Sequence, residues 1–164
     1  MKKLILMRHA KSAWNTDAPS DHARPLNERG RKSAPLIAKK LKELNWIPDL
    51  VLSSDSIRTK ETWMRMESTF YSCPPVHYLN ELYHGDLTDL QDMISIYVPN
   101  HTQCLLLLGH NPGWEEALSH LCGDQIRMTT ANAALLRCSE IEWSKAILNL
   151  GHWQCERILR PKEL

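Results

Sequence analysis

The chain has 164 residues, of which 43% are hydrophobic and 24% charged, and its formal net charge is +1. A chain of this length can build one ordinary hydrophobic core, so we expect a single domain over residues 1–164. The near-zero net charge lacks the strong basic excess of a dedicated nucleic-acid binder, so any cationic site must be local.

Cysteine usage and hydropathy indicate a cytoplasmic protein. The five cysteines are widely spread and never arranged as C-x-x-C, which suits neither a disulfide framework nor a zinc ribbon. Arg8 and His9 interrupt the first apolar run, Leu4–Met7, well before it reaches the length of a signal-peptide core. No other run approaches the roughly twenty residues of a membrane span, so we expect no membrane partner.

Short apolar runs alternate with segments of helical periodicity along the first three quarters of the chain. The apolar runs show no in/out alternation, which is typical of parallel strands covered on both faces by helices; they are Leu4–Met7, Leu50–Leu52 and Leu105–Leu108. The segments with helical periodicity are 37–44, 56–70, 87–98 and 112–122. This alternation predicts an α/β fold with a parallel sheet.

Local signals mark the helix ends, and the C-terminal part has a different character. Asn27 has a side chain preferred at an N-cap, and Pro112 suits the first turn of the last long helix. Pro35 would lie inside the helix that starts near Asn27, so we expect a kink or a broken start there. Residues 133–141 and 155–160 predict two strands in a hairpin-like ending, which makes the sheet mixed but mostly parallel.

Polar side chains follow three of the predicted strands at the point where each strand ends. Arg8 and His9 follow the first, Ser53-Ser54-Asp55 with Arg58 follow the second, and His110 follows the third. Open α/β sheets bind their ligands at these carboxyl ends. Arginines and a helix N-terminus there favour a phosphate ligand, and the arginines would keep a histidine neutral and able to act as a nucleophile. The pattern predicts covalent phosphoryl transfer.

These segments resemble the histidine phosphatase superfamily, whose fold is that of phosphoglycerate mutase. The short chain is most similar to the SixA-like phosphohistidine phosphatases within it. The resemblance spans most of the chain and rests on Leu4–Ala10, Trp14-Asn15, Arg24–Arg31, Ser53–Thr62 and Leu108–Gly113. It implies a three-layer α/β/α sandwich, with Ala10 standing where the family's Arg-His-Gly motif has glycine.

The resemblance also implies roles for the individual residues. His9 would attack phosphorus and form a phosphohistidine that water hydrolyses, while Arg8, Arg58 and His110 would bind the phosphoryl oxygens. Asn15 and Arg24 would be secondary phosphate or substrate contacts. Glu81 would be the general acid of the wider superfamily, although it suits an ordinary surface carboxylate equally well and SixA-like members manage without a defined acid. No cofactor is implied, and the histidines form no metal-binding motif.

Three functions remain open at this point. The stretch from Thr69 to Leu79 is too short for the insertion that closes over a small metabolite in mutases, so an open pocket and a phosphatase are favoured. Phosphohistidine on a partner protein, such as a histidine phosphotransfer domain, is the preferred substrate. A small phosphorylated metabolite is the alternative and would depend more on Glu81. A catalytically silent phosphate-binding module is the third function, and only Ala10 points to it.

Overall fold

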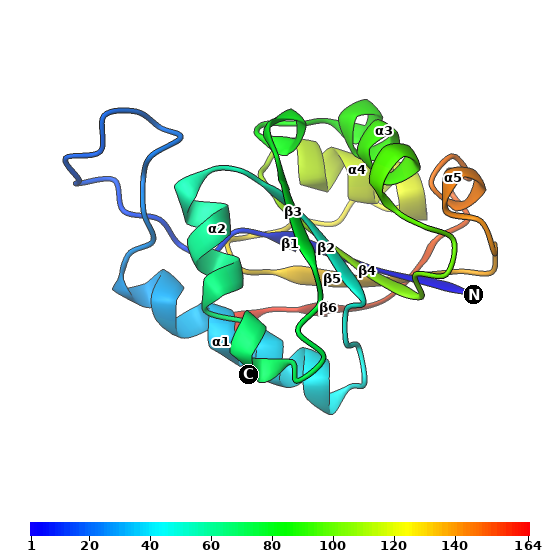
Figure 1. Cartoon of the computed structure of the whole chain (residues 1–164), viewed down its shortest axis with the longest axis horizontal. Helices are drawn as coiled ribbons and strands as arrows, with labels where there is room; N and C mark the ends of the chain where they lie inside the picture. The colour runs from blue at the N-terminus through cyan, green and yellow to red at the C-terminus, as the bar shows by residue number, and fades with distance from the viewer.

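Six strands form one mixed sheet in the computed structural model, which describes residues 1–164 (Figure 1). The strands lie in the order β3-β2-β4-β1-β5-β6. They are β1 (Lys2–Arg8), β2 (Leu50–Ser54), β3 (Val76–Leu79), β4 (Cys104–Gly109), β5 (Ala133–Cys138) and β6 (Gln154–Leu159). The four strands β1 to β4 run parallel, and only β5 pairs antiparallel with its neighbours β1 and β6. The predicted mostly parallel mixed sheet is confirmed.

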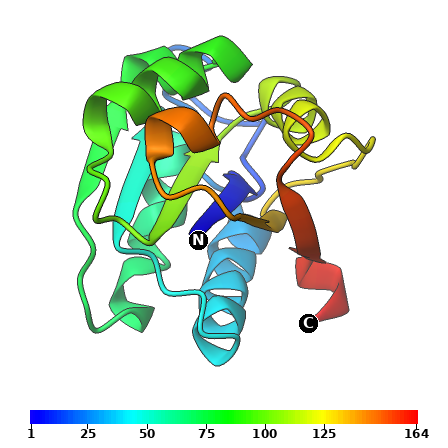
Figure 2. The same cartoon turned by 90° about the vertical axis from the view of Figure 1, so that its right-hand side faces the viewer.

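Helices cover both faces of this sheet and complete the three layers (Figure 2). One face carries α1 (Glu28–Glu43), α2 (Ile57–Met64) and the 3-10 turn η1 (Glu67–Thr69). The other carries α3 (Leu87–Tyr97), α4 (Gly113–Cys122) and α5 (Trp143–Ala146). Two further 3-10 turns are η2 (Asn80–Leu82) and η3 (Pro161–Glu163). None of the helices is long and apolar enough to cross a bilayer.

The central strands separate two apolar cores, which explains their unbroken hydrophobic sequence. Along β1, Leu4 and Leu6 point into one cluster of 24 buried residues. Ile5 and Met7 point into the other cluster, which has 20. Burying each such side chain contributes roughly 1.5–3 kcal/mol. The sheet is therefore anchored from both sides, and the ends of its strands are fixed points on which a site can be built.

The predicted helix starts are largely confirmed, but α1 is not broken at Pro35. The side chain of Asn27 caps α1 by accepting the Gly30 N–H at 2.9 Å, and Pro112 immediately precedes α4. The broken start at Pro35 is wrong, since α1 runs as one helix through this residue. Ala34 and Ile37 are buried on either side of it, and this packing outweighs the one hydrogen bond that proline removes.

Three further boundaries differ from the prediction. The helix expected over 56–70 ends at Met64, and the chain continues through η1. The strand expected over 133–141, which is β5, ends at Cys138, because the chain turns there toward α5. The edge strand β3 was not predicted, since its four residues include the exposed His77 and Tyr78 and form no apolar run. None of these differences affects the carboxyl ends of β1, β2 and β4.

Candidate active site

The carboxyl ends of β1, β2 and β4 bring the two predicted histidines together. Arg8 pairs with Gly109 in the parallel ladder, and the His9 N–H donates to the Gly109 carbonyl at 3.0 Å. The rings of His9 and His110 consequently lie 5.1 Å apart, centre to centre. Gly109 is required at this point because a Cβ there would stand 2.5 Å from the Trp114 ring.

One ring nitrogen of His9 is unprotonated and lies against Arg58. The side chain is 6% exposed, and its Nδ1 lies 2.7 Å from the Ala10 carbonyl, which can only accept. The proton is therefore on Nδ1, and Nε2 accepts from Arg58 Nε at 3.3 Å. Burial, helped by the charges of Arg58 and Arg8, lowers the pKa of His9 to about 3. The imidazole is neutral at physiological pH and its Nε2 can act as a nucleophile.

His110 lies beside it with one ring nitrogen held and the other without a partner. Its Nε2 is 2.8 Å from Ser54 Oγ. This hydroxyl already accepts the Ser56 N–H, so its own proton is available to His110. Nδ1 of His110 is buried and has no partner. Burial and the neighbouring His9 and Arg58 lower the pKa of His110 to about 2. A buried N–H without an acceptor is costly and marks a place where a ligand oxygen would bind.

The two arginines come from β1 and from the first turn of α2. Arg58 is 2% exposed, and Ser56 fixes this turn by capping α2 with its side chain. Arg8 donates from Nη1 to the Met128 carbonyl at 3.2 Å, whereas its Nε is buried and unpaired. Two donors on residues of the site, Arg8 Nε and His110 Nδ1, are thus left without a partner.

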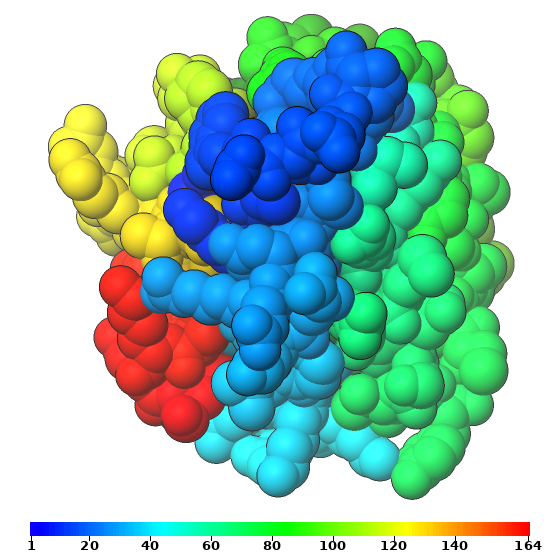
Figure 3. Space-filling model, turned by 90° about the vertical axis from the view of Figure 1, so that its left-hand side faces the viewer, coloured from blue at the N-terminus to red at the C-terminus, as the bar shows by residue number.

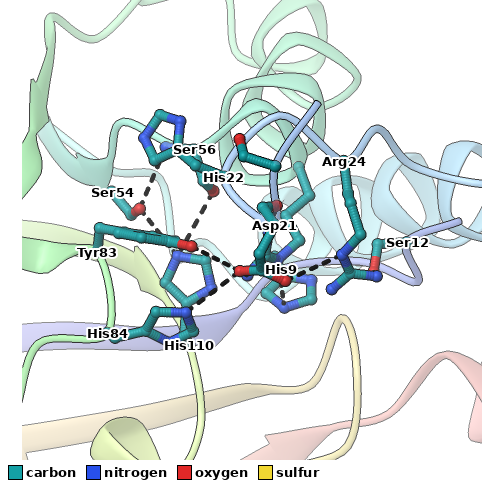
Figure 4. Close-up of polar contacts among 12 residues, drawn as sticks. His9, Ser12, Asp21, His22, Arg24, Ser54, Ser56, Tyr83, His84 and His110 are labelled. Atoms are coloured by element: carbon teal, nitrogen blue, oxygen red, sulfur yellow. Dashed lines mark hydrogen bonds and ion pairs between the residues drawn. The ribbon is translucent and has the colours of Figure 1, made fainter. Parts of the chain in front are cut away.

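A carboxylate of the chain itself, Asp21, lies in the site, where Figure 4 shows its contacts with Arg24, Tyr83 and His84. Asp21 Oδ2 accepts from Arg58 Nη2 at 3.0 Å and from the Tyr83 hydroxyl at 2.6 Å. Its Oδ1 accepts from Arg24 Nε at 3.0 Å, and its backbone carbonyl accepts from Arg58 Nη1 at 2.7 Å. Hydrogen bonds from Tyr83 and the arginines hold the pKa of Asp21 well below its usual range. An anion is therefore bound next to His9 in the resting protein.

Comparison with known proteins identifies the family to which this constellation belongs. The sequence matches the histidine phosphatase superfamily (branch 1) over residues 4–110. The chain belongs to the histidine phosphatase superfamily. An uncharacterized chloroplastic protein of Arabidopsis thaliana is 37% identical over 170 residues, which include 98% of this chain and 78% of that protein.

Solved structures of this histidine phosphatase's relatives confirm the expected fold. SixA from Agrobacterium tumefaciens is 26% identical, with a TM-score of 0.81 over 98% of both chains. The protein histidine phosphatase SixA, solved in complex with tungstate, superimposes with a TM-score of 0.82 over 98% of both chains and is 22% identical, which bears on the fold alone. The phosphoglycerate-mutase-like architecture predicted from the motifs is therefore correct.

The secondary residues of this histidine phosphatase lie at different distances from the centre. Arg24 is 8% exposed; it bonds Asp21 and Ser12 and stacks on Trp14, with 3.7 Å between the guanidinium carbon and the ring centre. Asn15 is exposed on the same loop and makes no hydrogen bond to the site. Glu81 is exposed on η2 and has no polar contact with His9, His110 or Arg58. Only Arg24 of these three joins the cluster.

Other side chains at the mouth of the site were not predicted. His84 Nε2 lies 3.3 Å from Asp21 Oδ2, and its ring centre is 5.1 Å from that of His110. His84 adopts φ 54, a left-handed backbone that is unusual for a residue with a side chain and recurs at functional sites. The sequence offered one signal for His84, which is that it lies three residues after Glu81, the candidate general acid. Asp21 has no sequence signal, because it lies in an irregular loop.

The alanine that replaces the family's glycine causes no visible strain. Ala10 is fully buried, and its backbone is not among the positions with positive φ. Its N–H donates to Thr62 Oγ1 at 3.0 Å, and its carbonyl holds His9 Nδ1. The backbone contacts that orient His9 therefore tolerate a methyl group here.

No set of three His, Cys, Asp or Glu side chains is arranged to hold a metal ion.

Proposed function

We propose that this histidine phosphatase removes the phosphoryl group of phosphohistidine on a partner protein, through a covalent intermediate on His9 and without a metal. The observation that carries the proposal is the state of His9, whose pKa is lowered to about 3 and whose unprotonated Nε2 lies against the Arg58 guanidinium, beside the ring of His110. A neutral nucleophile surrounded by donors for oxyanions is the arrangement that phosphoryl transfer requires.

The chemistry follows from these contacts. The lone pair of His9 Nε2 forms the new N–P bond, while the bond from phosphorus to the substrate imidazole breaks and its electron pair stays on that nitrogen. The phosphorylated ring of His9 is cationic, and its Nδ1–H remains bonded to the Ala10 carbonyl, which stabilises the charge. Arg58, Arg8 and His110 bind the phosphoryl oxygens. Water then attacks phosphorus, the His9 N–P bond breaks, and phosphate and one proton leave.

The form of the site favours a phosphoryl group presented on a protein surface. Only the 3-10 turn η2 and a short loop separate the carboxyl end of β3 from α3, so no long insertion at this end of the sheet covers the pocket. Asp21 and His84 at its mouth have side chains 43% and 51% exposed. A protonated imidazole is a good leaving group, so the transfer needs little help from Glu81, which lies outside the cluster. The neighbour from A. tumefaciens also carries the name of a phosphohistidine phosphatase.

The test compares an aryl phosphate with a phosphohistidine-bearing protein, each incubated in EDTA with wild-type protein, His9→Ala or the control His101→Ala. His101 is an exposed histidine outside the site. We expect wild type and His101→Ala to prefer the phosphohistidine protein and to form an acid-labile phosphoenzyme that His9→Ala lacks. Activity that survives His9→Ala, or is lost in EDTA, contradicts the mechanism. Phosphate binding without turnover would instead indicate a binding module.

The same variants test the alternative substrate. Glu81→Gln should change phosphohistidine hydrolysis little, because the leaving imidazole carries its own proton. A large loss with Glu81→Gln, together with saturable turnover of a phosphorylated metabolite, would favour a small-molecule phosphomonoesterase. A cytoplasmic location is also part of the proposal and is supported by the five free cysteines. The Arabidopsis relative is named as chloroplastic, so cell fractionation is the appropriate measurement.

A further inference from the structure

A second cationic region lies beside the site, on the face of the molecule seen in Figure 3, where the C-terminal turn (red) lies next to the start of α1 (blue). It is a groove of about 360 Å³ between the residues that follow β1, the N-terminal part of α1, the loop before β5 and the C-terminal turn η3. None of its lining residues is hydrophobic. Five of them are basic and one is acidic: Arg8, Lys11, Arg29, Arg160, Lys162 and Glu163. We refer to this region as the basic groove.

The outer cations of the basic groove have no counterion within the protein. Lys11, Arg29 and Lys162 take part in none of the ion pairs of the chain. Arg29 and Lys162 are exposed, and Lys11 is half-buried. The whole chain has a net charge of only +1, so this uncompensated charge is a local feature. Such a patch attracts anionic partners over about a Debye length.

The backbone fixes the basic groove relative to the nucleophile. Lys11 lies two residues after His9, and its carbonyl accepts the Asn27 N–H at 3.0 Å. Gly30 allows this contact, since a Cβ on Gly30 would stand 2.1 Å from the same carbonyl oxygen. The first turn of α1, which carries Arg29, is thereby held against the segment that leaves His9. A ligand in the groove would lie at a constant position beside the phosphoryl site.

We propose that the basic groove binds an acidic segment of the protein whose phosphohistidine enters the His9 pocket. The proposal rests on the proposed function and specifies its partner. Apart from the Pro161 ring, the lining has no apolar side chain for a hydrophobic helix or a lipid tail, and it has no aromatic ring on which a base could stack. Its cations come from separate segments rather than converging on one point, so they match several carboxylates spread along a chain.

The experiment uses two synthetic peptides of equal length, each with one histidine phosphorylated by phosphoramidate. One has glutamates on both sides of the histidine, and the other has glutamines. The variant Arg29→Glu/Lys162→Glu reverses two charges of the basic groove. The control Lys39→Glu/Arg65→Glu makes the same charge change at two exposed residues outside it. Hydrolysis of an aryl phosphate by all three proteins confirms that the fold and the His9 pocket are intact.

We expect wild type and control to hydrolyse the glutamate peptide at low salt with a kcat/KM about tenfold above that of the glutamine peptide. Arg29→Glu/Lys162→Glu should lose this preference and keep its aryl phosphate activity, and 200 mM salt should remove the preference in every protein. A preference that persists in the groove variant overturns the proposal.

A binding measurement separates failure of the groove from failure of the proposed function. Fluorescence anisotropy of the unphosphorylated, labelled glutamate peptide reports binding whether or not hydrolysis occurs. The proposal is supported if the wild type binds this peptide and the groove variant binds it about tenfold more weakly. This holds even if neither phosphopeptide is hydrolysed and the proposed function fails. Equal binding by both proteins contradicts it. Oligouridylate and unlabelled glutamate peptide are also compared as competitors. If oligouridylate displaces the labelled peptide at the lower concentration, the proposal is overturned in favour of a nucleic-acid surface.

Discussion

The His9 pocket and the basic groove are both cationic and adjoin at Arg8, but only in the pocket are cations paired with a carboxylate of the chain. In the pocket, Arg58 and Arg24 share the carboxylate of Asp21. In the groove, Lys11 and Arg29 have no such partner. His9, Arg24, Arg58 and His110 are buried in the pocket. In the groove, Arg29 and Lys162 are exposed and Lys11 is half-buried.

This difference separates two uses of positive charge. Bonds to Asp21 hold the buried arginines in one orientation before any substrate arrives, and orientation fixed in advance is what stabilises a transition state. The exposed side chains of the groove have no fixed geometry and can contribute to attraction and partner choice, but little to the reaction itself. Changes in the pocket should therefore alter chemistry for every substrate, and changes in the groove only for acidic ones.

Arg58→Met should have the largest effect. Removing a buried guanidinium that faces His9 Nε2 is expected to lower kcat/KM for an aryl phosphate by between about a hundred- and a thousandfold. Arg65→Met, at the C-terminal end of the same helix, provides the matched control because Arg65 is exposed. A loss of less than tenfold with Arg58→Met would show that the pocket does not depend on a fixed arginine.

Acidification should destabilise the protein through the pocket. The pKa values of His9 and His110 are lowered to about 3 and about 2, so below pH 6.5 the unfolded chain binds protons that the folded chain does not. Each histidine contributes fully to the free energy of unfolding above pH 6.5. Between pH 6.5 and pH 4 this free energy should fall by about 1.4 kcal/mol per pH unit for each histidine. Urea unfolding at several pH values measures this slope.

Two variants identify the source of the slope. His9→Asn/His110→Asn should flatten the dependence between pH 6.5 and 4.5, whereas the exposed His101→Asn should leave it unchanged. The lowered pKa of Asp21 acts in the same direction, since its contribution is present above the ordinary carboxyl pKa and is lost on further acidification. An equally steep slope in the double variant would mean that other groups dominate.

Asp21→Asn should make the pocket resemble the groove, with cations that lack a carboxylate partner. Inorganic phosphate then no longer competes with an internal anion for Arg58 and Arg24, and we expect it to bind about three- to tenfold more tightly. Isothermal titration with phosphate measures the change, and Asp17→Asn on the same loop is the control. Weaker binding by Asp21→Asn would mean that Asp21 mainly orients Arg58.

Ala10→Gly should have the smallest effect. Ala10 already has a negative φ and makes both backbone contacts, so glycine gains no conformation that the site needs. We expect the aryl phosphate rate to change by less than about twofold and stability to fall by about 0.5–1 kcal/mol, because glycine loses more backbone freedom on folding. A large gain in rate would show that the family's glycine serves close approach of the phosphate.

Sequence patterns predicted the parts of the molecule that have a regular hydropathy pattern or that carry a family motif. The buried strands β1, β2 and β4 were recognisable because covering on both faces produces unbroken apolar runs, and the residues that follow them are held together by the parallel register. The association of His9, Arg58 and His110 could be predicted for this reason. The edge strand β3 could not, since half-exposed residues leave no apolar run.

The contacts that refine the site depend on tertiary geometry. Asp21 reaches the arginines because the loop between β1 and α1 folds back over the strand ends, and no local pattern encodes that path. His84 depends in the same way on the turn after η2. At Pro35 the expected break is wrong, because burial of the turns on both sides of this proline outweighs the local rule against it. The roles implied for Asn15 and Glu81 stay predictions.

One hydroxyl, that of Ser56, both caps α2 and lies 3.5 Å from His110 Nε2. The first turn of that helix, which also carries Arg58, is thus part of the anion-binding constellation. An intermediate in which α2 is unwound should have no residual affinity for phosphate. Phosphate should consequently act as a thermodynamic probe of the complete fold, raising the unfolding temperature with its concentration as a ligand of the native state alone.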